Sequence, residues 1–169
     1  MAKGVKKAPR KSESELLSEL EIALIILWNS VRRWISQRSK GSAVKGLSDL
    51  DDFLLHFLVY RNRPLRGIDL AFALSVDDMH LVTYSLKKLT RLGTITAERV
   101  GKEVFYRAAD KGRQHYQEFL EDRSRYLEPA MRFLTGREQD LESVTSLIRA
   151  MSGVYEQAAR AAATAKGDA

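Results

Sequence analysis

Apolar side chains recur at helical spacing through the middle of this 169-residue chain. The first run predicts a helix that begins near Ser48, whose hydroxyl has capping-box spacing with the Asp51 carboxylate, and that reaches about Tyr60. After a break at Pro64, a second run predicts a short helix over residues 67–74. Its inward side would consist of four apolar residues: Ile68, Leu70, Ala71 and Leu74.

A third helix follows a four-residue turn at 75–78, where either aspartate can cap it, and should end at Gly93, which tolerates the left-handed conformation that closes helices. Its buried stripe recurs at spacings of three and four: Met79, Val82, Leu86 and Leu89. The opposite face is polar: His80, Thr83, Tyr84, Lys87 and Arg91. Helix, turn and helix in this order form the helix-turn-helix pattern.

Two β-rich runs around a glycine-containing turn follow at 95–107 and predict a hairpin. A hairpin directly after a helix-turn-helix is the wing of a winged helix, and its tip carries two cations. Four residues on the polar face of the third helix are candidates for reading base edges: His80, Thr83, Tyr84 and Lys87. Five cations at the rims and on the wing are candidates for holding phosphates: Arg66, Lys88, Arg91, Arg99 and Lys102.

The order and spacing of these motifs resemble the multiple antibiotic resistance regulator (MarR) family over roughly residues 48–116. The matching segments are Asp69-Leu70-Ala71, Val82-Thr83, Leu86, Leu89, Gly93-Thr94-Ile95, the hairpin and Ala109-Asp110-Lys111-Gly112-Arg113. The family's wing usually holds an Asp-x-Arg pair near its tip. The shorter turn here lacks that pair, so the resemblance does not carry minor-groove readout by an arginine to this chain.

The flanking segments predict two long helices that need partners. Residues 12–40 are apolar over much of the helix circumference, and residues 137–163 alternate apolar steps of three and four without a fault. Exposing such seams is unfavourable, so we expect both helices to pair two copies of the chain. The expected dimer interface comprises Leu20, Leu24, Leu27, Leu141, Val144, Ile148, Met151, Tyr155 and Ala158.

These elements predict a mainly α fold: a winged helix-turn-helix with a two-stranded β wing, flanked by N- and C-terminal dimerisation helices. We expect residues 12–169 to form a single winged-helix regulator domain with its DNA-binding part at 48–110, after a basic disordered tail at 1–11. The resemblance also implies a small, often aromatic and anionic effector, bound between the dimerisation helices and the winged helix. Rough location makes four residues candidates for that pocket: Trp28, Arg32, His56 and Tyr60. The polar stripe Asp52, His56 and Tyr60 could line a cavity, but we favour a structural reading, in which it hydrogen-bonds to a neighbouring helix.

Charge changes this picture in one respect. The net charge of +6 includes five cations in residues 1–11, and the remaining basic and acidic residues nearly balance. Within that remainder, residues 61–113 hold 11 Lys and Arg against 6 Asp and Glu. Positive charge therefore concentrates on the tail and the winged helix, as an electrostatic footprint on nucleic acid requires.

Other chemistry has little support. The chain has no cysteine, which fits a reducing compartment, and its three histidines fall on three different predicted helices. We find no phosphate-binding glycine loop or nucleophile elbow, and we expect no enzyme, no cofactor, no metal site and no membrane span.

We therefore expect a cytoplasmic, sequence-specific double-stranded DNA-binding transcriptional regulator. It would act as a repressor rather than an activator, bind a pseudo-palindromic operator as a homodimer and be released by a small-molecule effector. The alternative is a winged-helix protein-interaction module without DNA sequence specificity, in which the same exposed helix face binds a protein.

Overall fold

The computed structural model describes residues 11–135 and 138–167, and these are mostly helical. The chain divides into two compact units, one ending at Phe119 and the other beginning at Leu120. The basic tail expected at 1–11 lies outside the described residues except for Lys11. No helix in the described part of the chain is both long enough and apolar enough to cross a membrane.

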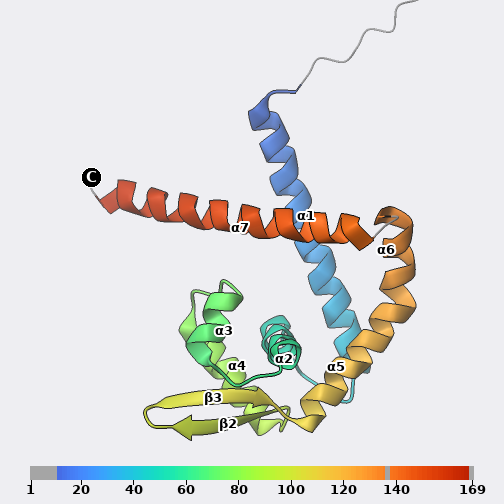
Figure 1. The fold of residues 1–169 in the computed structure, drawn as a ribbon, viewed down its shortest axis with the longest axis vertical. Helices are drawn as coiled ribbons and strands as arrows, with labels where there is room; N and C mark the ends of the chain where they lie inside the picture. The colour runs from blue at the N-terminus through green and yellow to red at the C-terminus, as the bar shows by residue number, and fades with distance from the viewer. Residues whose placement is uncertain (1–10, 136–137, 168–169) are drawn as a thin grey trace, which may run out of the picture. The chain divides into compact units, whose positions relative to one another are not determined.

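The first unit contains the winged helix. Its helices are α1 (Glu13–Gly41), α2 (Asp49–Arg61), α3 (Gly67–Ala73), α4 (Met79–Arg91) and the greater part of α5 (Asp110–Asp122). Its strands are β1 (Leu65–Arg66), β2 (Ile95–Val100) and β3 (Glu103–Ala108). Figure 1 shows α2, α3 and α4 gathered next to the β2–β3 hairpin, so the predicted winged helix-turn-helix is confirmed.

The sheet has one strand more than the sequence indicates. Strands β2 and β3 pair antiparallel from Ile95 with Ala108 to Val100 with Glu103, which makes the expected wing. The two-residue strand β1 pairs with the other edge of β3, so the order is β1-β3-β2. A strand this short has no alternation to detect, and only its position before α3 could have suggested it.

The local signals at the helix ends are confirmed. The Ser48 hydroxyl accepts a hydrogen bond from the Asp51 backbone N–H, and the Asp51 carboxylate accepts one from the Ser48 N–H at 2.7 Å. Asp78 caps α4 by accepting from the His80 N–H at 2.8 Å. Gly93 has a positive φ of 71°, the left-handed conformation that ends α4.

The core of the winged helix contains the predicted leucine stripes of α2, α3 and α4. Its fully buried members include Leu54, Leu55, Leu58, Leu70, Val82, Leu86 and Leu89. Two residues expected inside are exposed instead, Ile68 and Met79. Ile68 lies in the first turn of α3 and is 60% exposed, whereas Leu70 and Ala71 of the same helix are buried. Met79 is the first residue of α4 and lies before the helix reaches the core.

The second unit contains the end of α5, a π-helical segment over Arg123–Leu127, α6 (Glu128–Thr135) and α7 (Glu138–Gly167). The π-helical segment ends two residues before Pro129, a residue that disturbs a helix because proline lacks the N–H that a continuing helix needs. The Arg123 side chain pairs with Glu128 across this segment at 3.4 Å. α7 is 30 residues long, and its apolar side chains are largely exposed in the single chain.

Candidate nucleic-acid interface

Helix α4 has two faces of opposite character. Val82, Leu86 and Leu89 are buried against the core and fix the helix. The other face exposes all four residues predicted to read bases: His80, Thr83, Tyr84 and Lys87. The Tyr84 side chain is 65% exposed, so its ring and hydroxyl are available to a ligand outside the protein. The fold thus brings the four candidates together on one surface.

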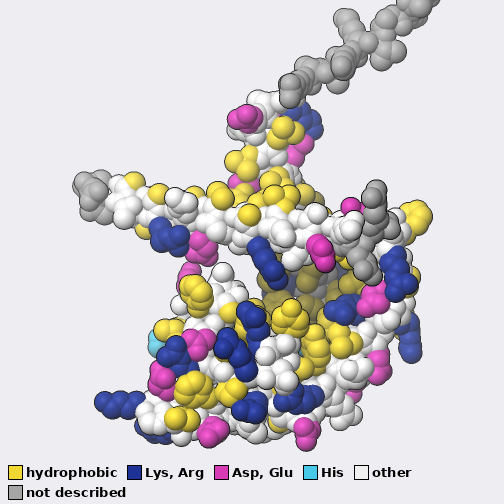
Figure 2. Space-filling view, viewed as in Figure 1, with side chains coloured by type: hydrophobic (Ala, Val, Ile, Leu, Met, Phe, Trp, Pro, Cys, Tyr) yellow, Lys and Arg dark blue, Asp and Glu magenta, His cyan; other side chains and the backbone are white. Residues whose placement is uncertain are grey.

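Cations surround this face. Arg91 and Lys87 are exposed on α4, and Arg99 and Lys102 are exposed on the wing. Figure 2 shows Lys and Arg side chains spread over the winged-helix unit. Among the described residues, none of these four cations forms an ion pair, and Arg99 only donates to the Gly101 carbonyl at 3.3 Å. Their charge is therefore available for phosphate oxygens.

Lys88 differs from these cations. Its ammonium donates to the Asp51 carboxylate at 2.6 Å and to the Gly46 carbonyl at 2.5 Å. Burial raises the pKa of Asp51, but hydrogen bonds from Lys88 and the Ser48 backbone outweigh it, and the pKa lies below its usual value. Lys88 thus joins α4 to the start of α2, with its charge matched inside the protein.

Arg66 is matched in the same way. Its guanidinium donates to both oxygens of Asp69, at 2.9 and 2.8 Å, and to Glu103 at 2.6 Å. Hydrogen bonds to Asp69 and then to Glu103 raise the pKa of Arg66. Since Glu103 begins β3, this side chain joins the start of α3 to the wing.

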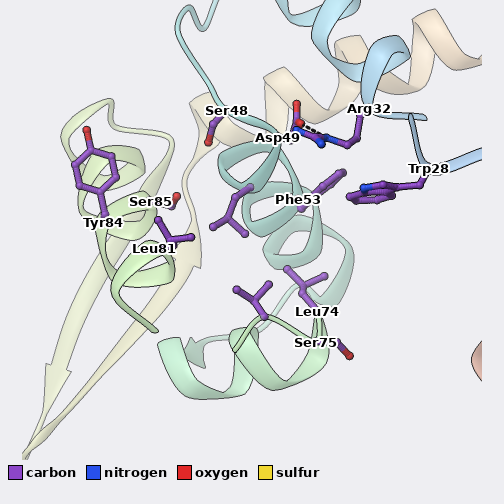
Figure 3. A pocket seen from close by; sticks show the side chains of 12 residues that line it. Trp28, Arg32, Ser48, Asp49, Phe53, Leu74, Ser75, Leu81, Tyr84 and Ser85 are labelled. Carbon is purple, nitrogen blue, oxygen red and sulfur yellow. Dashed lines mark hydrogen bonds and ion pairs between the residues drawn. The ribbon is translucent and has the colours of Figure 1, made fainter. Parts of the chain in front are cut away.

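A cavity of about 810 Å³ adjoins α4. Its walls come from α1, α2, the turn between α3 and α4, and α4 itself, as Figure 3 shows. The Trp28 and Phe53 rings face each other across a centroid distance of 5.6 Å. At the same end, Arg32 Nε donates to Asp49 Oδ2 at 2.6 Å. Tyr84, Leu81 and Ser85 of α4 complete the lining.

The four predicted effector residues do not share one cavity. Trp28 and Arg32 line the large cavity, whereas His56 and Tyr60 line a smaller one of about 290 Å³. The sequence missed most of the large cavity: Ser48, Asp49, Leu50, Phe53, Leu74, Ser75, Val76, Leu81 and Ser85. Their apolar members belong to helical stripes, and no pattern distinguishes an apolar side chain that lines a cavity from one that fills the core.

A buried polar cluster joins α1, α2 and α5. Asp52 Oδ1 lies 2.8 Å from His115 Nε2, and the Ser42 hydroxyl lies 2.7 Å from His115 Nδ1. Arg38 Nη2 lies 3.2 Å from His115 Nε2 and 3.7 Å from Asp52 Oδ1. Asp52 therefore bonds to a neighbouring helix, which is the structural reading of its stripe.

His56 belongs to the same cluster, and its ring centroid lies 6.0 Å from that of His115. Burial lowers the pKa of His56 to about 4, so the ring is neutral at neutral pH. Ligand atoms of Asp52, His56 and His115 lie within 4.8 Å of one another, a spacing that a metal ion could bridge. The Arg38 guanidinium already supplies positive charge there, and we interpret the cluster as a structural junction.

Comparison with known proteins identifies the fold. Residues 47–112 match a family model described as a winged helix DNA-binding domain. The chain is similar to the solved structure of a MarR protein from Peptoclostridium difficile, with a TM-score of 0.64 and 20% identity over 92% of this chain and 96% of that one. A MarR family regulator from Neisseria meningitidis gives a TM-score of 0.68 and 15% identity over 84% of this chain and 94% of that one. FabT from Streptococcus pneumoniae, solved in complex with DNA, gives a TM-score of 0.58 and 19% identity over 83% of this chain and 95% of that one.

No curated protein matches the sequence. The family model and the solved structures agree on the architecture. Residues 47–112 match a winged helix domain, and the fold of the chain is similar to that of solved MarR family regulators.

Proposed function

We propose that this protein is a sequence-specific double-stranded DNA-binding transcriptional regulator. The observation that carries the proposal is the exposed face of α4, which presents His80, Thr83, Tyr84 and Lys87 on a helix whose other face is locked in the core. In helix-turn-helix docking, the first turns of this helix enter the major groove, where such side chains meet base edges. The DNA complex of the structurally similar FabT supports the same use of the fold.

The cations divide by partner. Arg91, Arg99 and Lys102 are exposed without ionic partners in the described chain, and we assign them to phosphates. Lys88 and Arg66 were candidates for the same task, but their charges are matched by Asp51 and by Asp69 with Glu103. We infer that Lys88 and Arg66 position the recognition helix and the wing rather than hold phosphates.

A homodimer would present two copies of α4 to the DNA. The apolar side chains expected at its interface are open to solvent in the single chain, including Leu20 and Leu27 on α1 and Val144 and Ile148 on α7. Exposed apolar surface on this scale favours a partner, and an interface repeated by two-fold symmetry satisfies both copies. Two recognition helices would then meet a pseudo-palindromic operator with half-sites about 10 bp apart.

A regulator of this kind acts by occupying its DNA site rather than by catalysing a reaction. Repression therefore follows from occupying a promoter, and release follows from a ligand that disturbs the recognition helix. The cavity beside α4 is the place for that ligand, since Leu81 and Tyr84 line it. A bound molecule would contact the helix that we propose to read DNA.

The test is selection of genomic fragments by the purified protein, followed by titration of the retained site at several salt concentrations. We expect one enriched pseudo-palindrome and an affinity that falls steeply with salt, because phosphate contacts release counterions. Absence of an enriched sequence would contradict sequence-specific regulation.

One observation favours a second function, a protein-interaction module. Ile68 and Phe72 lie one turn apart on α3 and are 60% and 89% exposed, which leaves apolar surface outside the core. A protein partner could cover this pair. The same salt series separates the two functions, since an interaction module would bind no duplex under any of these conditions.

A further inference from the structure

We infer that the exposed face of α4 recognises thymine 5-methyl groups in the major groove, and that Thr83 is the residue that contacts them. This inference rests on the proposed function and adds which group of which base the helix recognises. It follows from the side chains that α4 presents and from the classes of side chain that it lacks.

Two of the usual classes of base-reading side chain are absent from α4. Carboxamides read adenine through a bidentate pair of hydrogen bonds, and carboxylates accept from the amino group of cytosine. The 13 residues of α4 include no Asn, Gln, Asp or Glu. The Asp78 carboxylate, which precedes the helix, accepts from the backbone N–H groups of His80 and Leu81 at 2.8 and 3.2 Å. Direct readout of adenine and cytosine by α4 therefore lacks its usual side chains.

Guanine readout depends on one cation in the middle of the helix. Lysine and arginine donate to O6 and N7 of guanine. Lys87 is exposed on the polar face, whereas Arg91 is the last residue of α4, about three turns beyond His80. The Lys88 ammonium is already bonded to Asp51 at 2.6 Å. Lys87 thus accounts for one guanine in each half-site, and further selection must come from another interaction.

Thr83 can supply that interaction. It is exposed about one turn after His80 and next to Tyr84, whose side chain is 65% exposed. The Thr83 hydroxyl makes no hydrogen bond to any described residue, whereas the hydroxyl of Thr90 on the same helix donates to the Leu86 carbonyl at 2.8 Å. The Thr83 side chain is therefore not held by its own helix, and its methyl group can turn towards the groove.

The methyl group of Thr83 discriminates among bases better than its hydroxyl does. A threonine hydroxyl can bond to several base edges, whereas the 5-methyl group occurs on thymine alone among the four bases. The Tyr84 ring next to it can shield the methyl contact from water. Burying one methyl group is worth about 4-fold in affinity. Two symmetric half-sites repeat the contact, so the operator as a whole should gain roughly 16-fold.

The experiment replaces thymine by uracil, which pairs in the same way but lacks the 5-methyl group. The probe is the operator duplex enriched from genomic fragments, synthesised once with thymine and once with uracil throughout. Fluorescence anisotropy on the full chain should show at least ~10-fold weaker binding to the uracil duplex. Single uracil substitutions should locate the loss at one thymine in each half-site, with about 4-fold at each.

Two substitutions of Thr83 separate this contact from any effect of uracil on the DNA itself. Thr83→Ser keeps the hydroxyl and removes the methyl group, so the ratio of the two affinities should fall below ~2-fold. Thr83→Val keeps a methyl group and removes the hydroxyl, so the ratio should stay at ~10-fold or more. A change in DNA shape caused by uracil would act equally on both variants. Circular dichroism and thermal melting establish that both variants are folded.

Two results would overturn the methyl contact while the proposed function stands. These are equal affinity of the wild type for the thymine and uracil duplexes, and a thymine preference that folded Thr83→Ser retains in full. Failure to enrich any sequence would instead refute the proposed function, and the methyl contact with it.

Discussion

The winged helix and the two long terminal helices treat their apolar side chains in opposite ways. In the winged helix, Leu54, Leu70 and Leu86 are at most 1% exposed. On α1 and α7, leucines of the same size such as Leu27 and Leu147 are 52% and 61% exposed. The winged helix therefore buries its apolar side chains within its own core. The apolar surface that α1 and α7 leave exposed in the single chain is the reason that we propose a second copy.

The largest effect should come from truncating a buried side chain of the winged helix. Leu86→Ala truncates a fully buried side chain of α4 and should lower the free energy of unfolding by about 2–5 kcal/mol, because the truncation leaves a cavity in the core. Leu147→Ala makes the same change on the exposed surface of α7 and should cost less than about 1 kcal/mol. Urea unfolding followed by circular dichroism measures both. Equal destabilisation by the two variants would remove the distinction between the two regions.

A charged side chain on the exposed apolar surface of α1 should separate the two copies without unfolding the chain. Leu27→Asp forfeits about 1.5–3 kcal/mol of apolar burial per copy at the proposed interface, and symmetry counts it twice. We expect the dimer dissociation constant to rise by ~100-fold or more. Sedimentation velocity measures it, with Ser36→Asp on the exposed part of α1 as the control. A wild-type protein that sediments as a monomer of 19.2 kDa at micromolar concentration would refute the proposed dimer.

The buried polar junction of α1, α2 and α5 should make stability depend on pH. The pKa of His56 is about 4 in the folded chain, against an ordinary value of 6.5, chiefly because burial disfavours its charged form. As pH falls from about 6.5 towards 4, the unfolded chain binds this proton first, so stability decreases over that window. His56→Phe should remove about 1–2 kcal/mol of the stability difference between pH 7 and pH 5.

Urea unfolding at the two pH values tests this expectation. His80→Gln serves as the matched control, since it removes an exposed histidine. A pH dependence that is identical in the wild type and in His56→Phe would show that His56 does not titrate differently on folding.

The smallest effect should come from the wing. Arg99→Ala and Lys102→Ala each remove one exposed cation, and each should weaken all duplexes about equally. The slope of log affinity against log salt should fall by roughly one for each phosphate that the variant no longer neutralises. Fluorescence anisotropy over a salt series measures this slope. A variant that changes the preferred sequence instead would show that the wing reads bases.

The sequence predicts the winged helix well because the spacing of apolar residues directly indicates which helix faces are buried. The leucine stripes, the Ser48 capping box, the Asp78 cap and the left-handed Gly93 are all local signals, and each is confirmed. Met79 and Ile68 were expected inside but are exposed, because spacing shows the apolar side of a helix and not where that side leaves the core.

The candidate site was harder to predict, because its partners are distant in sequence. On a helical wheel Lys88 looks like a rim cation, and its bond to Asp51 forms only when α2 packs against α4. His56 and His115 are far apart in the chain and meet in the junction. The split of the four effector candidates between two cavities likewise depends on packing that no local pattern records.

The central claim is that the exposed face of α4 reads DNA, and neighbouring lysines on that helix offer the sharpest test. Lys87→Ala, like Tyr84→Ala, should cost on the order of 1–3 kcal/mol at the selected operator and relax preference at one or two base positions. Lys88→Ala removes the bond to Asp51, so it should weaken binding with an unchanged salt slope. Anisotropy titrations with the operator and with single-base variants measure these changes. Wild-type affinity and site preference in both Tyr84→Ala and Lys87→Ala, with dimerisation retained, would contradict the claim.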